Sequence, residues 1–375
     1  MNPFVPTFGV SPAILGGRDA LTSGFGASLE AGPGDPRRTL LISGPRGIGK
    51  TVLLNELEDE AARRGWMHVR AQPYDLIQPL VDTEIPRALQ RLRQSNPNRR
   101  KVTGVSVAGL GGFSTSAAEG AEPAPSLTSA LHELCDALPG PSGVLITLDE
   151  VQSVDQTDLW HLTAAVQDLR RDNRNIAFAA AGLPEGVARL LQHPGTTFLR
   201  RAQHAVLAPM TPAETASVLQ TTAAAGGLDL EGDALNEAVG FTRGYPFLVQ
   251  LLGYHVFQRV SASSTKASVD DIIAVRGTVL DSLGQLVHDP ALSPVPAGER
   301  AYLAAMAEIQ RGQEAVASAD IARHMGKRTQ ELSVVRDRLI RRELIYSPRR
   351  GYLNFLIPYL GRHLTGSGTR DLGWD

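Results

Sequence analysis

A glycine-rich turn between a short apolar stretch and a helix constrains this chain more than any other segment. Its residues run Gly44-Pro45-Arg46-Gly47-Ile48-Gly49-Lys50-Thr51 and match G-x-x-x-x-G-K-[ST], the phosphate-binding loop. Residues 40–42 are apolar and read as a strand, and residues 52–54 begin a helix. The glycines allow backbone angles that are closed to residues with a Cβ, so main-chain amides can curl around an anion. The stretch therefore predicts a site for the phosphates of a nucleotide.

Two side chains of this loop carry the chemistry. Lys50 brings a compact cation to the outer phosphates, and Thr51 offers a hydroxyl to Mg²⁺. The chain has only four lysines, so composition alone does not explain one at position 50. We predict that Thr51 binds the metal. Lys50 is predicted to be a catalytic residue as well as a phosphate ligand. The residues expected to bind ATP here are Gly44, Pro45, Arg46, Gly47, Ile48, Gly49, Lys50, Thr51 and Val52.

A second motif follows about 100 residues later. Residues 143–148 form an apolar run that ends in Asp149 and Glu150. Buried parallel strands read as continuous apolar runs, and ligands bind at their carboxyl ends. Asp149 is expected to support the Mg²⁺ shell, and Glu150 to activate the attacking water. A strand followed by a charged turn is the plainer alternative, which the phosphate loop upstream disfavours.

Length and composition limit the classes of protein to which this chain can belong. With 375 residues, 42% of them hydrophobic and 20% charged, the chain suits a globular protein of two or three domains. Its single cysteine, Cys135, excludes an internal disulfide framework and a cysteine-rich zinc site. We find no secretion signal and no apolar run approaching the ~20 residues of a membrane span. We therefore expect a cytoplasmic protein without membrane contact.

The C-terminal part reads as a winged helix-turn-helix. Helices are predicted over residues 299–309, 318–326 and 329–342, and strands over 344–347 and 352–356. Residues 318–365 hold ten basic against four acidic residues, a net charge of +6, whereas the whole chain has −2. This favours double-stranded DNA as a partner, although a winged helix that docks a protein is an open alternative. The DNA-contact candidates are Arg328, Arg336, Arg338, Arg349 and Arg350.

The order of motifs resembles that of the archaeal-type AAA+/STAND ATPases, relatives of the archaeal origin-recognition initiators. Gly17-Arg18 precedes the phosphate loop and Asp149-Glu150, and Arg200-Arg201, Gly244-Tyr245-Pro246 and the winged helix follow. The resemblance implies an α/β fold: a P-loop NTPase core with a five-stranded parallel sheet, a helical lid that moves with nucleotide state, and the winged helix. It does not extend to the strand at residues 175–181, which ends in Ala-Gly-Leu-Pro where the family often has a polar residue.

The resemblance also implies roles for further residues. Gly17 and Arg18 would lie against the adenine, and Tyr245 and Pro246 would close over it. Arg200 or Arg201 would act as the arginine finger, often across a subunit boundary. From the residues alone, Gly17-Arg18 can be a helix cap, Gly244-Tyr245-Pro246 a turn between helices, and the arginine pair a solvated pair or a salt bridge.

These observations give one expected organisation and two functions. The expected domains are an extended segment at 1–16, a core at 17–210 with an inserted hairpin or loop at 101–125, a lid at 211–289, a winged helix at 297–365 and a tail at 366–375. We expect a Mg²⁺-dependent ATPase whose nucleotide state controls a DNA-binding winged helix. The alternative is a slow signalling switch whose winged helix docks a protein partner. A homo-oligomer is expected if the finger acts between subunits.

Overall fold

The structure is a computed structural model. It describes residues 1–95 apart from 8, 13 and 15, and then residues 126–192, 194–260, 264–310 and 315–366. The predicted insert at 101–125 and all but the first residue of the predicted tail lie outside these ranges. Within them, no helix is long and apolar enough to cross a membrane.

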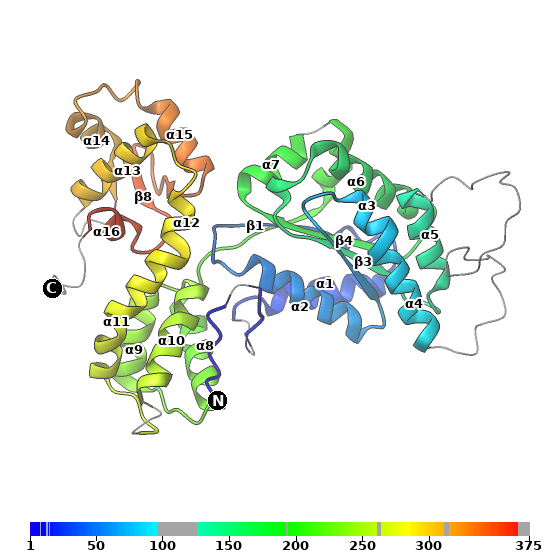
Figure 1. Cartoon of the computed structure of the whole chain (residues 1–375), viewed down its shortest axis with the longest axis horizontal. Helices are drawn as coiled ribbons and strands as arrows, with labels where there is room; N and C mark the ends of the chain where they lie inside the picture. Colours follow the sequence, from blue (N-terminus) through cyan, green and yellow to red (C-terminus); the bar gives the residue numbers. More distant parts are fainter. Residues whose placement is uncertain are drawn as a thin grey trace, which may run out of the picture.

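A five-stranded parallel sheet forms the centre of the core, as predicted (Figure 1). Its strands, in the spatial order β2-β3-β4-β1-β5, are β2 (Met67–Ala71), β3 (Val144–Leu148), β4 (Ile176–Gly182), β1 (Thr39–Ser43) and β5 (Gln203–Val206). Every residue of β1, β3 and β4 is buried, because helices cover both faces. Ser43 pairs with Gly182 and Val206, so the carboxyl ends of these strands meet at one edge.

Helices cover the sheet in two layers (Figure 1). One face carries α1 (Asp19–Ala31) and α2 (Lys50–Arg63). The other carries α3 (Ile77–Pro79), α4 (Ile85–Ser95), α5 (Leu127–Ala137), α6 (Gln156–Arg171) and α7 (Pro184–Gln192). Alternate residues of β1 serve the two layers: Leu40 and Ile42 pack on the α1–α2 side and Leu41 on the opposite side.

A group of helices follows β5 in the range predicted as the lid, and this name is kept for it below. It consists of α8 (Pro212–Ala225), α9 (Gly232–Thr242), α10 (Pro246–Val260) and α11 (Val269–Leu283). Thr211 and Glu214 form a capping box at the start of α8, which satisfies two of the helix's unpaired amides. The N-terminal segment packs on this lid, because Phe4 is buried in its core and the Val5 amide donates to the Gln250 side chain at 3.0 Å.

The C-terminal domain is joined to the lid by a nearly continuous helix: α11, a π-helical turn at Gly284–His288 and α12 (Asp289–Leu292). Its elements are α13 (Ala297–Gln310), β6 (Val316–Ala317), α14 (Ser318–His324), α15 (Ser333–Arg341), β7 (Ile345–Tyr346), β8 (Tyr352–Phe355) and α16 (Leu360–Leu364). The three strands pair antiparallel in the order β6-β8-β7.

Helix α16 was not predicted, and two further details of this domain differ from the sequence prediction. Helix α15 begins at Ser333 and not at Thr329, because the Ser333 hydroxyl bonds to the Gln330 carbonyl and the preceding residues form turns. Strand β6 was not predicted, since its two residues are too few to show an alternating pattern.

Candidate functional site

The glycine-rich loop connects β1 to α2 at the carboxyl edge of the sheet. Gly47 and Gly49 have φ angles of +73° and +95°, which residues with a Cβ rarely adopt. A Cβ on Gly47 would also lie 2.6 Å from the Tyr245 hydroxyl. Lys50, Thr51 and Val52 form the first turn of α2, so their amides have no partner within the helix and can bind an anion.

The Lys50 ammonium is folded back onto this loop. Its Nζ donates to the carbonyl oxygens of Gly44 at 2.6 Å and Pro45 at 3.0 Å. The side chain is only 7% exposed. Burial lowers the pKa of Lys50, and the carboxylates of Glu343, Glu150 and Asp149 oppose that shift. The structure therefore places a cation among acidic groups from separate parts of the chain.

The acidic motif meets the loop directly. The Thr51 hydroxyl donates to Asp149 Oδ2 at 2.5 Å, and the Glu150 amide donates to Asp149 Oδ1 at 2.8 Å. Glu150 has a left-handed backbone (φ +54°), and its exposed side chain lines the same cavity as Lys50. The Thr51 and Asp149 oxygens therefore lie side by side, and Glu150 lines the cavity beside Lys50.

A cavity of about 360 Å³ opens beside these groups. Its walls come from the N-terminal segment (Val5 to Ile14), from Gly16 and Arg18, from the loop at 46–52, and from the start of α10 at Pro246 and Phe247. Arg18 donates to the Ala208 carbonyl at 2.7 Å. Gly17 is at a turn with φ +69°, where a Cβ would meet the Glu214 carboxylate. Arg18 and Pro246 thus lie at the cavity, as the nucleotide assignment requires.

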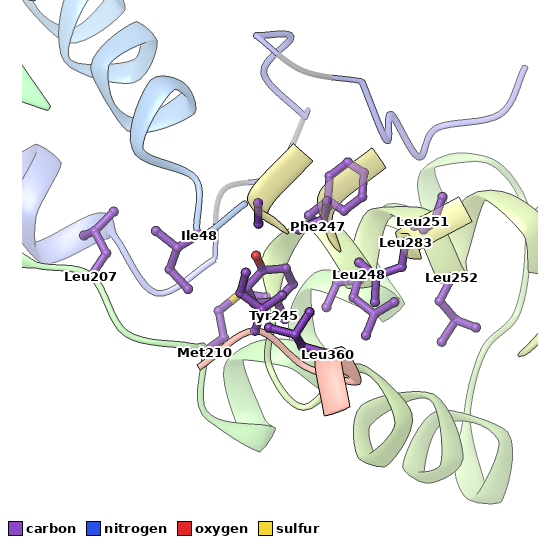
Figure 2. Packing of buried hydrophobic residues seen from close by; sticks show 14 of the residues in the cluster. Ile48, Leu207, Met210, Tyr245, Phe247, Leu248, Leu251, Leu252, Leu283 and Leu360 are labelled. Carbon is purple, nitrogen blue, oxygen red and sulfur yellow. The ribbon is translucent and has the colours of Figure 1, made fainter. Parts of the chain in front are cut away.

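Tyr245 has a different position from the one expected. It is fully buried, and its hydroxyl donates a hydrogen bond to the Arg46 carbonyl. Figure 2 shows its ring between Met210 and Leu360, close to Ile48 of the loop. A second hydrogen bond joins this segment to the phosphate loop, since the Phe247 amide donates to the Gly47 carbonyl at 3.3 Å. Tyr245 therefore supports the loop, whereas its neighbours Pro246 and Phe247 line the cavity.

The structure separates Arg200 and Arg201 from the loop of their own chain. Both are exposed and lie in η5 (Pro194–Arg201), just before β5 begins at Gln203. They are thus at the amino edge of the sheet, while the loop is at the carboxyl edge. Arg200 Nε donates to the Leu191 carbonyl at 2.9 Å. A catalytic role within one chain is therefore incompatible with this arrangement, because the sheet lies between the two sites.

Sequence reasoning missed Gln152. Its amide nitrogen donates to the Glu150 carboxylate, and its Oε1 accepts a 2.9 Å hydrogen bond from the Leu183 amide, just after β4. A Cβ on Gly182, the last residue of β4, would lie 2.7 Å from this oxygen. Gln152 thus supplies a polar group at the point where β4 carries none. The only available signal was its position two residues after Glu150.

Glu343 was also missed, and it comes from the C-terminal domain. It follows α15, is 5% exposed, and faces the Lys50 and Arg46 charges of the phosphate loop. Burial raises its pKa to about 7, although these two cations and the nearby Glu150 also act on it. Nothing in the local sequence distinguishes this glutamate from an ordinary surface residue.

The five arginines predicted to contact DNA have different surroundings. Arg328 pairs with Glu331 at 2.5 Å and Arg336 with Asp337 at 2.9 Å. Arg338 lies 3.8 Å from the buried Glu299. Arg349 stacks on the Tyr352 ring, with 3.8 Å to its centroid, and Arg350 is exposed in the same turn between β7 and β8.

Comparison with known proteins agrees with this geometry. Residues 15–179 match the AAA ATPase domain family, and residues 285–364 match a domain family of unknown function. The fold is similar to the Walker-type ATPase of Pyrococcus abyssi (14% identity, 94% of this chain and 96% of that chain covered, TM-score 0.63). It is also similar to the ORC2 protein of Aeropyrum pernix (15% identity, 96% of each chain covered, TM-score 0.61). No curated protein sequence matches the chain.

Proposed function

We propose that this AAA+ ATPase, which is related in fold to archaeal ATPases, uses ATP at its phosphate loop to control the position of its C-terminal domain. One observation carries the proposal. The hydrogen bond from Thr51 to Asp149 joins the loop to the acidic strand end, and Lys50 and Glu150 line a single cavity beside it. This is the arrangement that phosphoryl transfer to water needs.

We assign nucleotide binding to three parts of the cavity wall. The loop amides of Gly44 and of Arg46 to Val52, together with the Lys50 ammonium, would hold the phosphates, and Pro45, which has no N–H, would shape the loop. Arg18 and Pro246 would lie against the base, with Gly17 supplying the turn before α1. Tyr245 would act indirectly, since its hydroxyl holds the Arg46 carbonyl and so fixes the shape of the loop.

The Thr51 and Asp149 oxygens fit a Mg²⁺ site. They are 2.5 Å apart, and Mg²⁺ is usually bound by few protein oxygens together with substrate phosphates and water. Mg²⁺ held there would neutralise charge that develops on the phosphates. Glu150 would orient and deprotonate the attacking water, and the Gln152 amide would hold its carboxylate in place.

We place the arginine finger in a second copy of the chain. Arg200 and Arg201 are exposed at the opposite edge of the sheet, which supports an action on a neighbour's site in a homo-oligomer. The two residues remain alternatives for this role.

We propose that residues 297–365 are a winged helix that binds DNA. Three helices, α13 to α15, followed by the β7–β8 hairpin support this assignment, as does the net charge of +6 over residues 318–365. Arg349 and Arg350 at the hairpin turn and Arg328 before α15 are exposed, which suits phosphate contacts. Arg328 would have to leave its pair with the exposed Glu331, and Arg338 and Arg336 their pairs with Glu299 and Asp337. The other proposed divisions are the segment 1–16, the core 17–210 and the lid 211–289.

Lys50→Ala tests the ATPase part of the proposal. We expect ATP affinity and steady-state phosphate release to fall by about 100-fold or more, since the variant loses a buried charge at the phosphates. Lys266→Ala is the matched control, because that lysine lies in an exposed ion pair with Asp229. Normal ATP binding and hydrolysis by the Lys50 variant would refute the assignment of the site.

Adding duplex DNA tests the second part. We expect DNA to change the hydrolysis rate and to bind with an affinity that falls steeply with salt. Strand β4 itself ends without a polar side chain, and Gln152 brings a side-chain amide to that point from another element; this favours the alternative, a slow switch whose C-terminal domain docks a protein. Slow turnover that is indifferent to duplex DNA would support that alternative.

A further inference from the structure

Glu343 reaches the phosphate loop from a domain far away in sequence. It lines a second cavity, of about 140 Å³, at the contact between the core and the C-terminal domain. The core contributes Arg46, Gln152 and Arg189 to this cavity, and the C-terminal domain contributes Arg342 beside Glu343. The glutamate therefore lies at a contact through which movement of the C-terminal domain would reach the loop directly.

The carboxylate is buried without a hydrogen-bond partner. Glu343 is 5% exposed, and among the described residues neither of its side-chain oxygens has a partner. A buried unpaired carboxylate is unfavourable, and such groups in a folded protein call for an explanation. Packing alone does not explain the glutamate, because an apolar residue would fill this position without the free-energy cost of burying a carboxylate.

The backbone of Glu343 is also unfavourable for its residue type. Its φ angle is +58°, in the turn where the Glu343 amide bonds to Ile340 O and the Leu344 amide bonds to Leu339 O. This is the position at a helix end where glycine is usual. Strained backbone positions that persist in folded proteins are concentrated at functional sites. Both features suggest that the carboxylate is kept for its charge.

The charged groups around Glu343 are of the kind that surround a bound phosphate. The Lys50 ammonium and the Arg46 guanidinium attract it, and Glu150 repels it. Arg189, Glu185, Arg341 and Arg342 also line the cavity, and the Tyr245 phenol lies close enough to feel its charge. Arg46 lines both this cavity and the nucleotide cavity, and Gln152, which bonds to Glu150, lines this one. The Glu343 anion therefore lies next to the position that a terminal phosphate would occupy.

We propose that Glu343 takes the place of the terminal phosphate, so that the closed chain accepts a nucleoside diphosphate and a triphosphate must displace Glu343. Glu343 lies between the buried Leu339 and the buried Leu344 and Ile345, so its backbone cannot move far without the domain. Displacing its carboxylate therefore releases the C-terminal domain from the core. This inference rests on the proposed nucleotide site, and it makes Glu343 the residue that distinguishes ATP from ADP.

The test compares the affinities of full-length protein for ADP and for a non-hydrolysable ATP analogue, both with Mg²⁺. Glu343→Gln removes the charge and keeps the shape, and Glu343→Gly also relieves the backbone. Glu331→Gln is the control, because Glu331 is in the same domain but exposed and paired with Arg328. We expect both Glu343 variants to gain about tenfold in affinity for the analogue relative to ADP, because like-charge repulsion is removed. The control should keep the ratio of the wild type.

Small-angle scattering supplies a second readout. The wild type should expand with the triphosphate analogue and remain compact with ADP, whereas Glu343→Gln should be expanded with either nucleotide. Unchanged affinity ratios in both Glu343 variants, with nucleotide binding still dependent on Lys50, would overturn this inference and leave the proposed function standing. Failure of the wild type to bind either nucleotide would overturn the proposed function, and this inference with it.

Discussion

The Thr51 hydroxyl donates a 2.5 Å hydrogen bond to the Asp149 carboxylate, although 98 positions separate the two residues in the sequence. One follows β1 and the other follows β3, and the parallel sheet brings both strand ends to the same edge. The contact therefore defines where the proposed metal and phosphates would meet.

Asp149→Asn should abolish most of the turnover without unfolding the protein. The amide keeps the shape and can still accept from Thr51, but it loses the charge that the metal needs. We expect phosphate release to fall by about 100-fold or more. Thermal unfolding should be little changed. Asp168→Asn, in an exposed pair with Arg171 at 3.8 Å, is the control and should turn over normally. Wild-type turnover by Asp149→Asn would contradict the metal assignment.

Glu150→Gln should separate binding from hydrolysis. If Glu150 activates water, its loss should slow single-turnover hydrolysis by about 100- to 10,000-fold. Nucleotide affinity should stay close to that of the wild type, since the carboxylate is exposed and is not required to hold phosphates. Glu133→Gln, an exposed acid on α5, serves as the comparison. Equal losses of affinity and rate would point to a role in binding instead.

Tyr245→Phe should loosen the phosphate loop. The change removes the hydrogen bond to the partly buried Arg46 carbonyl, which costs about 1 kcal/mol. We expect lower stability in urea unfolding and weaker nucleotide binding together. Tyr346→Phe removes a hydroxyl from a partly exposed ring and should leave both measurements unchanged. An unaffected nucleotide affinity would show that the loop keeps its shape without this contact.

His288 should make the protein less stable in acid. It is buried at the π-helical turn, where its Nε2 lies 2.9 Å from the Pro358 carbonyl, and burial lowers its pKa to about 4. The unfolded chain binds the proton near pH 6.5, so the folded state binds fewer protons between these values. Stability contributed by the neutral ring is complete above pH 6.5 and is lost as the pH falls towards 4.

Denaturant unfolding at several pH values measures this effect. The wild type should lose about 1.4 kcal/mol for each pH unit below 6.5 through this group, until the pH reaches about 4. His288→Gln should lack that part of the dependence, because it cannot be protonated. Parallel curves for the two proteins between pH 6.5 and 4 would contradict the assignment.

Arg349→Ala with Arg350→Ala should weaken DNA binding uniformly across sequences. Both residues are exposed at the hairpin turn, so we expect each to lower the salt dependence of binding by about one unit if it contacts a phosphate. Arg338→Ala should instead lower stability, since it removes one of the cations near the buried Glu299. A salt dependence that the double variant leaves unchanged would favour the protein-docking alternative.

The predicted core and the observed core agree because their signals are local. The glycines of the loop allow left-handed backbone angles, and the continuous apolar runs before Gly44 and Asp149 predicted buried parallel strands. The five-stranded parallel sheet and the fold class followed from these patterns together with the family resemblance. The predictions were less accurate for the two-residue strand β6 and for the start of α15, where short-range side-chain bonds decide the structure.

The sequence by itself determined the phosphate loop, the acidic strand end and the order of elements, because backbone angles and hydrophobic periodicity depend on neighbouring residues. Only the tertiary structure decided three relationships. Tyr245 bonds to the Arg46 carbonyl of the loop, Gln152 bonds to Glu150, and Glu343 lies near the Lys50 charge. Each of these contacts depends on how distant segments pack. Burial in that packing sets an ordinary glutamate apart, because it raises the pKa of Glu343 and holds the carboxyl group near the cations of the phosphate loop.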